Sequence, residues 1–132
     1  MKTLCVSLET AKALRARGWT KPTAFYWDSE ERDILVMGEG SALVWDNDVF
    51  MPTAEEVLRE LPPFIDAIKF DGKRERMERF NLLCRAEEVM YQCLRPLLCL
   101  WAVERIGRLS EAAAQMWIWC VENNYIKLEA KP

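Results

Sequence analysis

Residues 23–37 read TAFYWDSEERDILVM. Two runs of apolar, aromatic and β-branched residues, 23–27 and 34–37, flank a charged stretch, which is typical of two strands joined by a polar turn. Residues 38–40 suit a second turn, and residues 42–45 a third strand. Because successive strands with short connections favour antiparallel pairing, this part of the chain predicts a small antiparallel meander.

A helix over residues 8–17 is expected before the meander. Ser7 can cap its amino end, and apolar residues recur inside it at helical spacing. Gly18 suits the left-handed position that often follows the last turn of a helix. The spacing of the apolar residues therefore changes from that of a helix to that of a strand near residue 22.

A second helix is expected after the meander. Thr53 and Glu56 match a capping box, and the prolines at 62–63 end the helix that it starts. Residues 64–70 resume an extended, apolar-rich pattern, and residues 71–72, Asp-Gly, form a strong tight-turn dipeptide.

Residues 73–106 allow two interpretations. The apolar residues fall on spacings that a long helix would use, and Pro96 would divide it, so we favour two helical pieces that meet there. The charged run 73–79 is then a solvated helix face. The alternation of apolar side chains over residues 80–84 also permits a short strand, and the choice for residues 74–84 stays open.

The last predicted helix covers residues 111–124, with Ser110 as its cap. It is apolar almost all the way round, so it is buried on more than one side or meets another molecule. Burial of Trp117 and Trp119 in the core is the first interpretation. The other is an interface, because tryptophan is over-represented among binding hot spots.

These elements predict one α+β domain over residues 1–132, a small antiparallel sheet of three to four strands packed with four to five helices. The length of 132 residues and the 51% apolar content are sufficient for a single core. The start of the chain lacks the apolar stretch of a secretory signal, and the longest apolar run is too short to cross a bilayer. We therefore expect a cytoplasmic protein.

The residue types argue against an enzyme. The chain has no histidine, which removes the usual proton shuttle and the commonest metal ligand. Phosphate-binding glycine loops, a nucleophile elbow and a complete calcium loop are also missing from the sequence. The five cysteines follow no closely paired spacing, so we interpret them as buried free thiols. We expect no catalytic residue, cofactor or metal.

Charge is distributed unevenly along the chain, although the net charge is only -3. Residues 23–62 carry ten acidic and two basic side chains. They could present an acidic face to a basic groove on a partner, which would speed association and make it salt-sensitive. Together with the tryptophans of the last helix, the residues that we expect to contact a partner are Asp28, Glu30, Glu31, Asp46, Asp48, Trp117 and Trp119.

Several segments carry a family-level resemblance. They are residues 5–11, CVSLETA, residues 18–19, GW, residues 25–27, FYW, residues 52–58, PTAEEVL, and residues 110–119, SEAAAQMWIW. In this order they resemble small uncharacterised proteins of bacteriophage and prophage genomes. The resemblance implies an α+β fold and a phage origin, with no activity assigned to any residue. The longest departure is residues 74–106, where relatives are expected to have a shorter, strand-containing segment.

The expected function is therefore a non-enzymatic, phage-type binding protein. It would inhibit or redirect a host protein, for example a defence protein, through an acidic face and an aromatic patch. The alternative is a structural or assembly protein that works through self-association as a homo-oligomer. Direct nucleic-acid binding is disfavoured because the basic runs are interleaved with acidic residues, and no membrane partner is expected.

Overall fold

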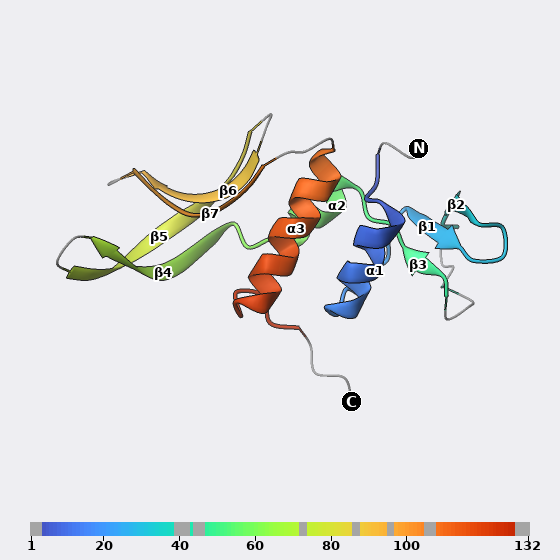
Figure 1. Ribbon diagram of the computed structural model, residues 1–132, viewed down its shortest axis with the longest axis horizontal. Helices are drawn as coiled ribbons and strands as arrows, with labels where there is room; N and C mark the ends of the chain where they lie inside the picture. The colour runs from blue at the N-terminus through green and yellow to red at the C-terminus, as the bar shows by residue number, and fades with distance from the viewer. Residues whose placement is uncertain are drawn as a thin grey trace.

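The computed structural model describes residues 4–38, 43, 47–71, 74–85, 88–94, 97–104 and 108–128. Within them the chain forms three helices and two antiparallel sheets. Figure 1 shows the helices in the middle of an elongated molecule, with one sheet at each end. The helices are α1 (Leu8–Ala16), α2 (Ala54–Glu60) and α3 (Leu109–Glu122).

The smaller sheet is the predicted meander with one change. Its strands are β1 (Phe25–Asp28), β2 (Asp33–Val36) and β3 (Val49–Phe50), in the order β2-β1-β3. The first two predicted strands and the turn between them are confirmed, because Asp28 pairs with Asp33 across the hairpin. The third predicted strand, residues 42–45, falls almost wholly outside the described residues, and β3 follows it in the sequence.

The larger sheet is built from consecutive strands in the order β4-β5-β6-β7, and each neighbouring pair is antiparallel. The strands are β4 (Phe64–Asp71), β5 (Arg74–Cys84), β6 (Glu88–Leu94) and β7 (Leu97–Glu104). The predicted extended segment 64–70 is therefore confirmed. Asp71 pairs with Arg74, so the hairpin turns at the predicted site, although residues 72–73 themselves lie outside the description.

The helical interpretation of residues 73–106 is wrong, and the chain has three helices in its described part rather than four to five. In β5 the buried Phe80 and the half-buried Leu82 alternate with the exposed Arg79 and Asn81. This period of two places one row of side chains against the core and the other in solvent. Pro96, at which two helical pieces were expected to meet, follows β6 and precedes β7 in the sequence and lies outside the described residues.

The charged run 73–79 is consequently no helix face. Within it, Arg79 forms an ion pair across the strands with Asp66, at 3.0 Å, and its guanidinium lies 3.9 Å from the centre of the Phe64 ring. The Arg79 side chain lowers the pKa of the Asp66 carboxyl by hydrogen bonding to it. Arg79, which suggested a pair along one helix, thus pairs with an acidic residue of the neighbouring strand.

Three of the predicted helix boundaries are confirmed, two by side-chain caps and one by a backbone angle. The Ser7 hydroxyl accepts a hydrogen bond from the Thr10 amide and caps α1. Thr53 and Glu56 form the reciprocal capping box of α2. Gly18 follows α1 with a φ of 102°, a conformation that an L side chain rarely adopts.

The predicted cap of the last helix is wrong. Arg108 occupies the cap position of α3 without a side-chain cap bond, and Ser110 lies inside the first turn. The Ser110 side chain is buried, and its hydroxyl has no hydrogen-bond partner among the described residues. A serine just before an apolar run is a cap only when it stays outside the helix, and here the helix begins one residue before it.

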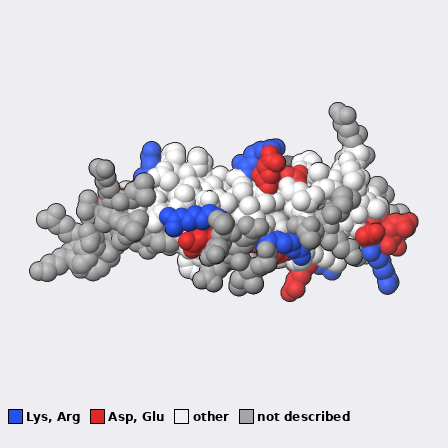
Figure 2. All heavy atoms as spheres, turned by 90° about the horizontal axis from the view of Figure 1, so that it is seen from above, with Lys and Arg blue, Asp and Glu red and all other residues white. Residues whose placement is uncertain are grey.

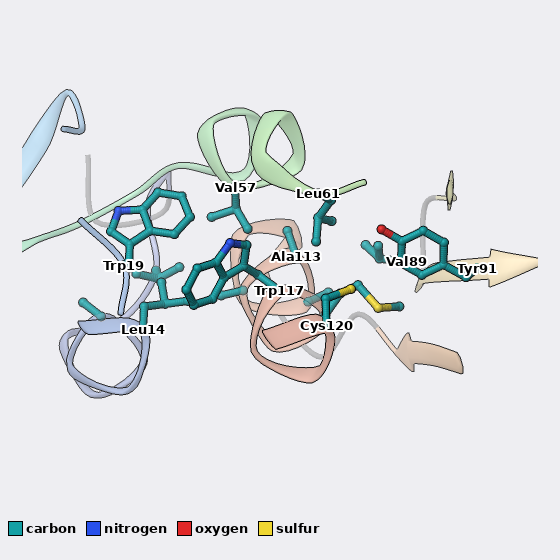
Figure 3. Packing of buried hydrophobic residues seen from close by; sticks show 14 of the residues in the cluster. Leu14, Trp19, Val57, Leu61, Val89, Tyr91, Ala113, Trp117 and Cys120 are labelled. Atoms are coloured by element: carbon teal, nitrogen blue, oxygen red, sulfur yellow. The ribbon is translucent and has the colours of Figure 1, made fainter. Parts of the chain in front are cut away.

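Helix α3 lies at the centre of the core. Its three consecutive alanines, Ala112 to Ala114, are buried, and their small side chains allow α2 to approach closely. Figure 3 shows Trp117 pointing toward Leu14 and Trp19, while Cys120 faces Tyr91 of the larger sheet. The Trp117 and Trp19 rings meet edge to face, with centroids 5.2 Å apart.

Polar contacts also join the first helix to the last. The Glu111 carboxylate accepts hydrogen bonds from the Ser7 amide and the Thr10 hydroxyl at the amino end of α1. Farther along the two helices, Arg17 and Glu122 form an ion pair at 3.1 Å. Because these pairs are more than 100 residues apart in sequence, they fix the ends of the chain against each other.

Candidate functional site: an aromatic patch

Three aromatic side chains form a continuous stack where α3 meets β7. We call Trp101, Trp119 and Tyr125 the aromatic patch. The Trp101 and Trp119 rings are almost parallel, with an interplanar angle of 2° and centroids 5.5 Å apart. Tyr125 lies on Trp119 at 5.3 Å with a tilt of 32°. The three rings come from a strand, a helix and the segment that follows the helix, so tertiary packing assembles them.

Exposure distinguishes the members of the patch. Trp101 leaves 45% of its surface in solvent, whereas Trp119 and Tyr125 are partly buried. Beneath them, the fully buried Tyr91 lies 6.5 Å from Trp119 and donates a hydrogen bond to the Pro62 carbonyl at 2.7 Å. Burial raises the pKa of the Tyr91 hydroxyl, so it stays protonated at neutral pH. The patch therefore packs on a tyrosine that is held in place and uncharged.

A break in the strand register accompanies the position of Trp101. Tyr91 pairs with Trp101, but the next residue, Gln92, pairs with Cys99, so the ladder shifts between these two positions. Such irregularities change the direction of side chains and often lie beside functional surfaces. Here Trp101 lies opposite Tyr91 and stacks on Trp119 of α3.

The two tryptophans predicted as partner contacts take different positions. Trp117 is only 3% exposed and belongs to the core, which agrees with the first of the two interpretations for that ring. Trp119 faces the opposite way along α3 and joins the aromatic patch. Trp101, its most exposed member, was missed by our sequence analysis because residues 73–106 were assigned to helices.

The predicted acidic residues are not equally exposed. Glu30 and Glu31 extend into solvent at the turn of the β1–β2 hairpin. The half-buried Asp28 accepts hydrogen bonds from both of their amides, so it shapes the turn. Asp48 is buried, and its carboxylate accepts hydrogen bonds from the amide and hydroxyl of Ser29. Asp46 lies outside the described residues.

The aromatic patch and the acidic turn are separate surfaces. Figure 2 shows acidic side chains gathered at the end of the molecule that the β1–β2 hairpin forms, with a basic side chain beside them. The aromatic patch belongs to α3 and the larger sheet, and α1 lies between α3 and the smaller sheet (Figure 1). Among the described residues, the predicted acidic and aromatic side chains are thus not brought together in one site.

Two of the buried cysteines are poor nucleophiles at neutral pH. Burial raises the pKa of the Cys120 thiol to about 11, and it also raises the pKa of Cys5. Cys93 is buried as predicted, but Cys84 is exposed, so the prediction of buried thiols is wrong for that residue. The side chain of Cys99 lies outside the description. The buried thiols that are described contribute to packing.

The described residues contain neither a metal-binding group nor a membrane-spanning helix. No three His, Cys, Asp or Glu side chains come together there in a group that could hold a metal ion. None of the described helices has the length and apolarity needed to cross a membrane.

Comparison of the chain with protein-family models, curated proteins and solved structures found no match.

Proposed function

We propose that this chain is a non-enzymatic binding protein of phage type that acts in the bacterial cytoplasm. It covers a surface of a host protein with its aromatic patch and thereby blocks or redirects that protein. The proposal assigns binding to Trp101 and Trp119, with Tyr125 at the margin of the contact. Trp117 has no direct role in it.

The exposed Trp101 ring, stacked on Trp119, is the observation that carries this proposal. Tryptophan offers a large contact area, and in this stack one ring already restrains the other, so little side-chain freedom remains to be lost on binding. Aromatic side chains held in this way are typical of the residues that dominate binding energy in protein interfaces.

The acidic turn contributes to the rate of encounter in this proposal. Glu30 and Glu31 are exposed at one end of the molecule, away from the patch. Exposed charges outside the contact act through the long-range field of the protein, chiefly on the association rate and its salt dependence. A basic region on the host protein would therefore be attracted to this end before the aromatic contact forms.

The experiment begins with affinity capture from bacterial host lysate and identification of bound proteins by mass spectrometry. The purified partner is then titrated with the full chain and with two variants. Trp101→Ala should weaken binding by roughly thirtyfold or more, as expected for a hot spot. Met77→Ala is the matched control, because Met77 is another exposed apolar side chain, on β5, with 64% of its surface in solvent. It should bind like the unmodified chain.

Two results would contradict the proposal. If Trp101→Ala keeps its native fold and binds the partner as tightly as Met77→Ala, the patch is not the contact surface. If a double replacement of Glu30 and Glu31 by lysine leaves the association rate and its salt dependence unchanged, the acidic turn has no steering role.

A further inference from the structure

Helix α3 ends in a Schellman motif, a hydrogen-bonded stop in which the residue after the helix adopts a left-handed backbone. Asn124 is that residue, with a φ of 63°. Its amide donates to the Val121 carbonyl at 3.2 Å, and the Tyr125 amide donates to the Cys120 carbonyl at 2.8 Å. These two hydrogen bonds are the signature of the motif. The chain therefore leaves the helical path at Asn124.

This helix end decides where the Tyr125 ring lies. In a Schellman motif the residue after the left-handed one often contacts an apolar residue in the last turns of the helix. Here the contact is aromatic, because the Tyr125 ring lies on Trp119 with centroids 5.3 Å apart. The backbone and side-chain amides of Asn123 both donate to the Trp119 carbonyl, at 3.0 and 2.9 Å. One member of the aromatic patch is thus placed by the end of α3 itself.

Trp119 is the ring on which the other two members of the patch meet. Trp101 lies on it from β7, and Tyr125 lies on it from the segment after α3. We propose that Asn124 is a positioning residue for the aromatic patch. Its left-handed backbone keeps Tyr125 on Trp119, and this contact limits the motion of Trp119 against Trp101. A patch whose rings are already restrained loses less side-chain freedom when it binds a partner.

The residue type at position 124 follows from this role. Asparagine is one of the few residues other than glycine that adopt a left-handed backbone routinely, whereas a β-branched side chain strongly opposes it. Asn124 is exposed, so its replacement removes little packing. A substitution there therefore acts mainly through the backbone. The consequence for binding rests on the proposed function, but the arrangement of the rings can be tested with the purified chain alone.

Two substitutions and one matched control separate this effect from a general loss of stability. Asn124→Val opposes the left-handed backbone, and Asn124→Gly permits it. Arg32→Val is the control, because Arg32 is another exposed residue with a positive φ, 52°, and it lies in the β1–β2 turn, away from the patch (Figure 1). The two valine variants should lower the melting temperature by similar amounts, about 5 °C.

The first measurement is the NMR spectrum of the indole N–H groups of the six tryptophans. Trp101→Phe and Trp119→Phe each remove one signal and so assign the two signals of the patch. In Asn124→Val these two signals should move, because the rings around them change position. In Asn124→Gly they should stay where they are in the unmodified chain. Arg32→Val should leave them in place as well.

The second measurement is the affinity of the full chain for the host protein that it captures. Asn124→Val should raise the dissociation constant by about threefold to tenfold, the effect of one or two side chains that are no longer restrained before binding. Asn124→Gly should bind like the unmodified chain. If Trp101→Ala binds normally, the proposed function fails, whereas the NMR comparison still decides whether Asn124 positions the rings.

Several results would overturn the inference. Patch signals that do not move in Asn124→Val show that the rings keep their places without this stop. Signals that move equally in Asn124→Gly or in Arg32→Val show that the left-handed backbone is not the cause. An unchanged affinity of Asn124→Val, with both signals displaced, removes its role in binding. If Asn124→Val does not fold, Asn124→Ala, which opposes the left-handed backbone less, is compared with Asn124→Gly in the same way.

Discussion

Replacing Trp117 by alanine should destabilise the protein far more than replacing Trp101 by alanine. Trp117 is 3% exposed and meets Trp19 edge to face in the core. A buried tryptophan removes about 200 Å² from water, and at about 25 cal/mol per Å² its loss costs about 4–5 kcal/mol. Trp101 keeps nearly half of its surface in solvent, so the same calculation gives about 2–3 kcal/mol as an upper figure for that ring.

The assay is urea unfolding followed by far-UV circular dichroism, because tryptophan fluorescence changes with the substitution itself. With a slope of about 2 kcal/mol per M, Trp117→Ala should lower the midpoint by about 2 M and Trp101→Ala by about 1 M. Equal losses for the two variants, or a loss below about 1 kcal/mol for Trp117→Ala, would refute the assignment of one ring to the core and the other to the patch.

Three further substitutions test local features of the fold. Ser110→Ala should leave the unfolding free energy unchanged or raise it by up to about 1 kcal/mol, because it removes a buried hydroxyl without a described partner. Ser7→Ala should lower the unfolding free energy by about 1 kcal/mol, because it removes the cap of α1. If urea melts show a larger loss for Ser110→Ala than for Ser7→Ala, Ser110 is the cap after all. Gly18→Ala should lower the unfolding free energy by at least about 1–2 kcal/mol, since the residue has a positive φ and an added Cβ would lie 2.5 Å from a leucine methyl. An unchanged free energy in thermal unfolding would show that an L side chain is tolerated at this position. Burial raises the pKa of Cys120 to about 11 from 9.0, so the folded state holds this proton more tightly than the unfolded chain does. The stability that it provides is complete below about pH 9 and is lost as the pH rises toward 11, whereas stability between about pH 6 and 8 should be nearly flat. Cys120→Ala should reduce the fall in stability between pH 9 and 10 and leave the part of that fall that is due to Cys5. A steep fall in stability below pH 8 in urea melts would contradict this assignment to the two thiols.

The sequence predicted best those features that depend on neighbouring residues. The caps at Ser7 and Thr53 and the stop at Gly18 are local, because each involves hydrogen bonds or backbone angles within a few positions. The β1–β2 hairpin was found for the same reason, since its turn is polar and its strands are short.

Features set by distant contacts were predicted poorly. Residues 74–104 contain apolar positions compatible with both a helix and a strand, and pairing between strands decides the choice. The alternation around Phe80 was the correct signal, and the uncharged, strand-forming run 97–103 could have indicated a strand with Trp101 on it. Nothing near Asp48 in the sequence indicated that Ser29 would hold its carboxylate in a buried position.

The link between Glu111 and the start of α1 has a consequence for biosynthesis. A ribosome releases Ser7 and Thr10 long before it has made the carboxylate that binds them. The emerging amino-terminal half also lacks α3, whose alanines and Trp117 fill the centre of the core. Folding of the helical centre must therefore wait until α3 has been synthesised, and nascent chains that stop before α3 should be substrates for chaperones and proteases.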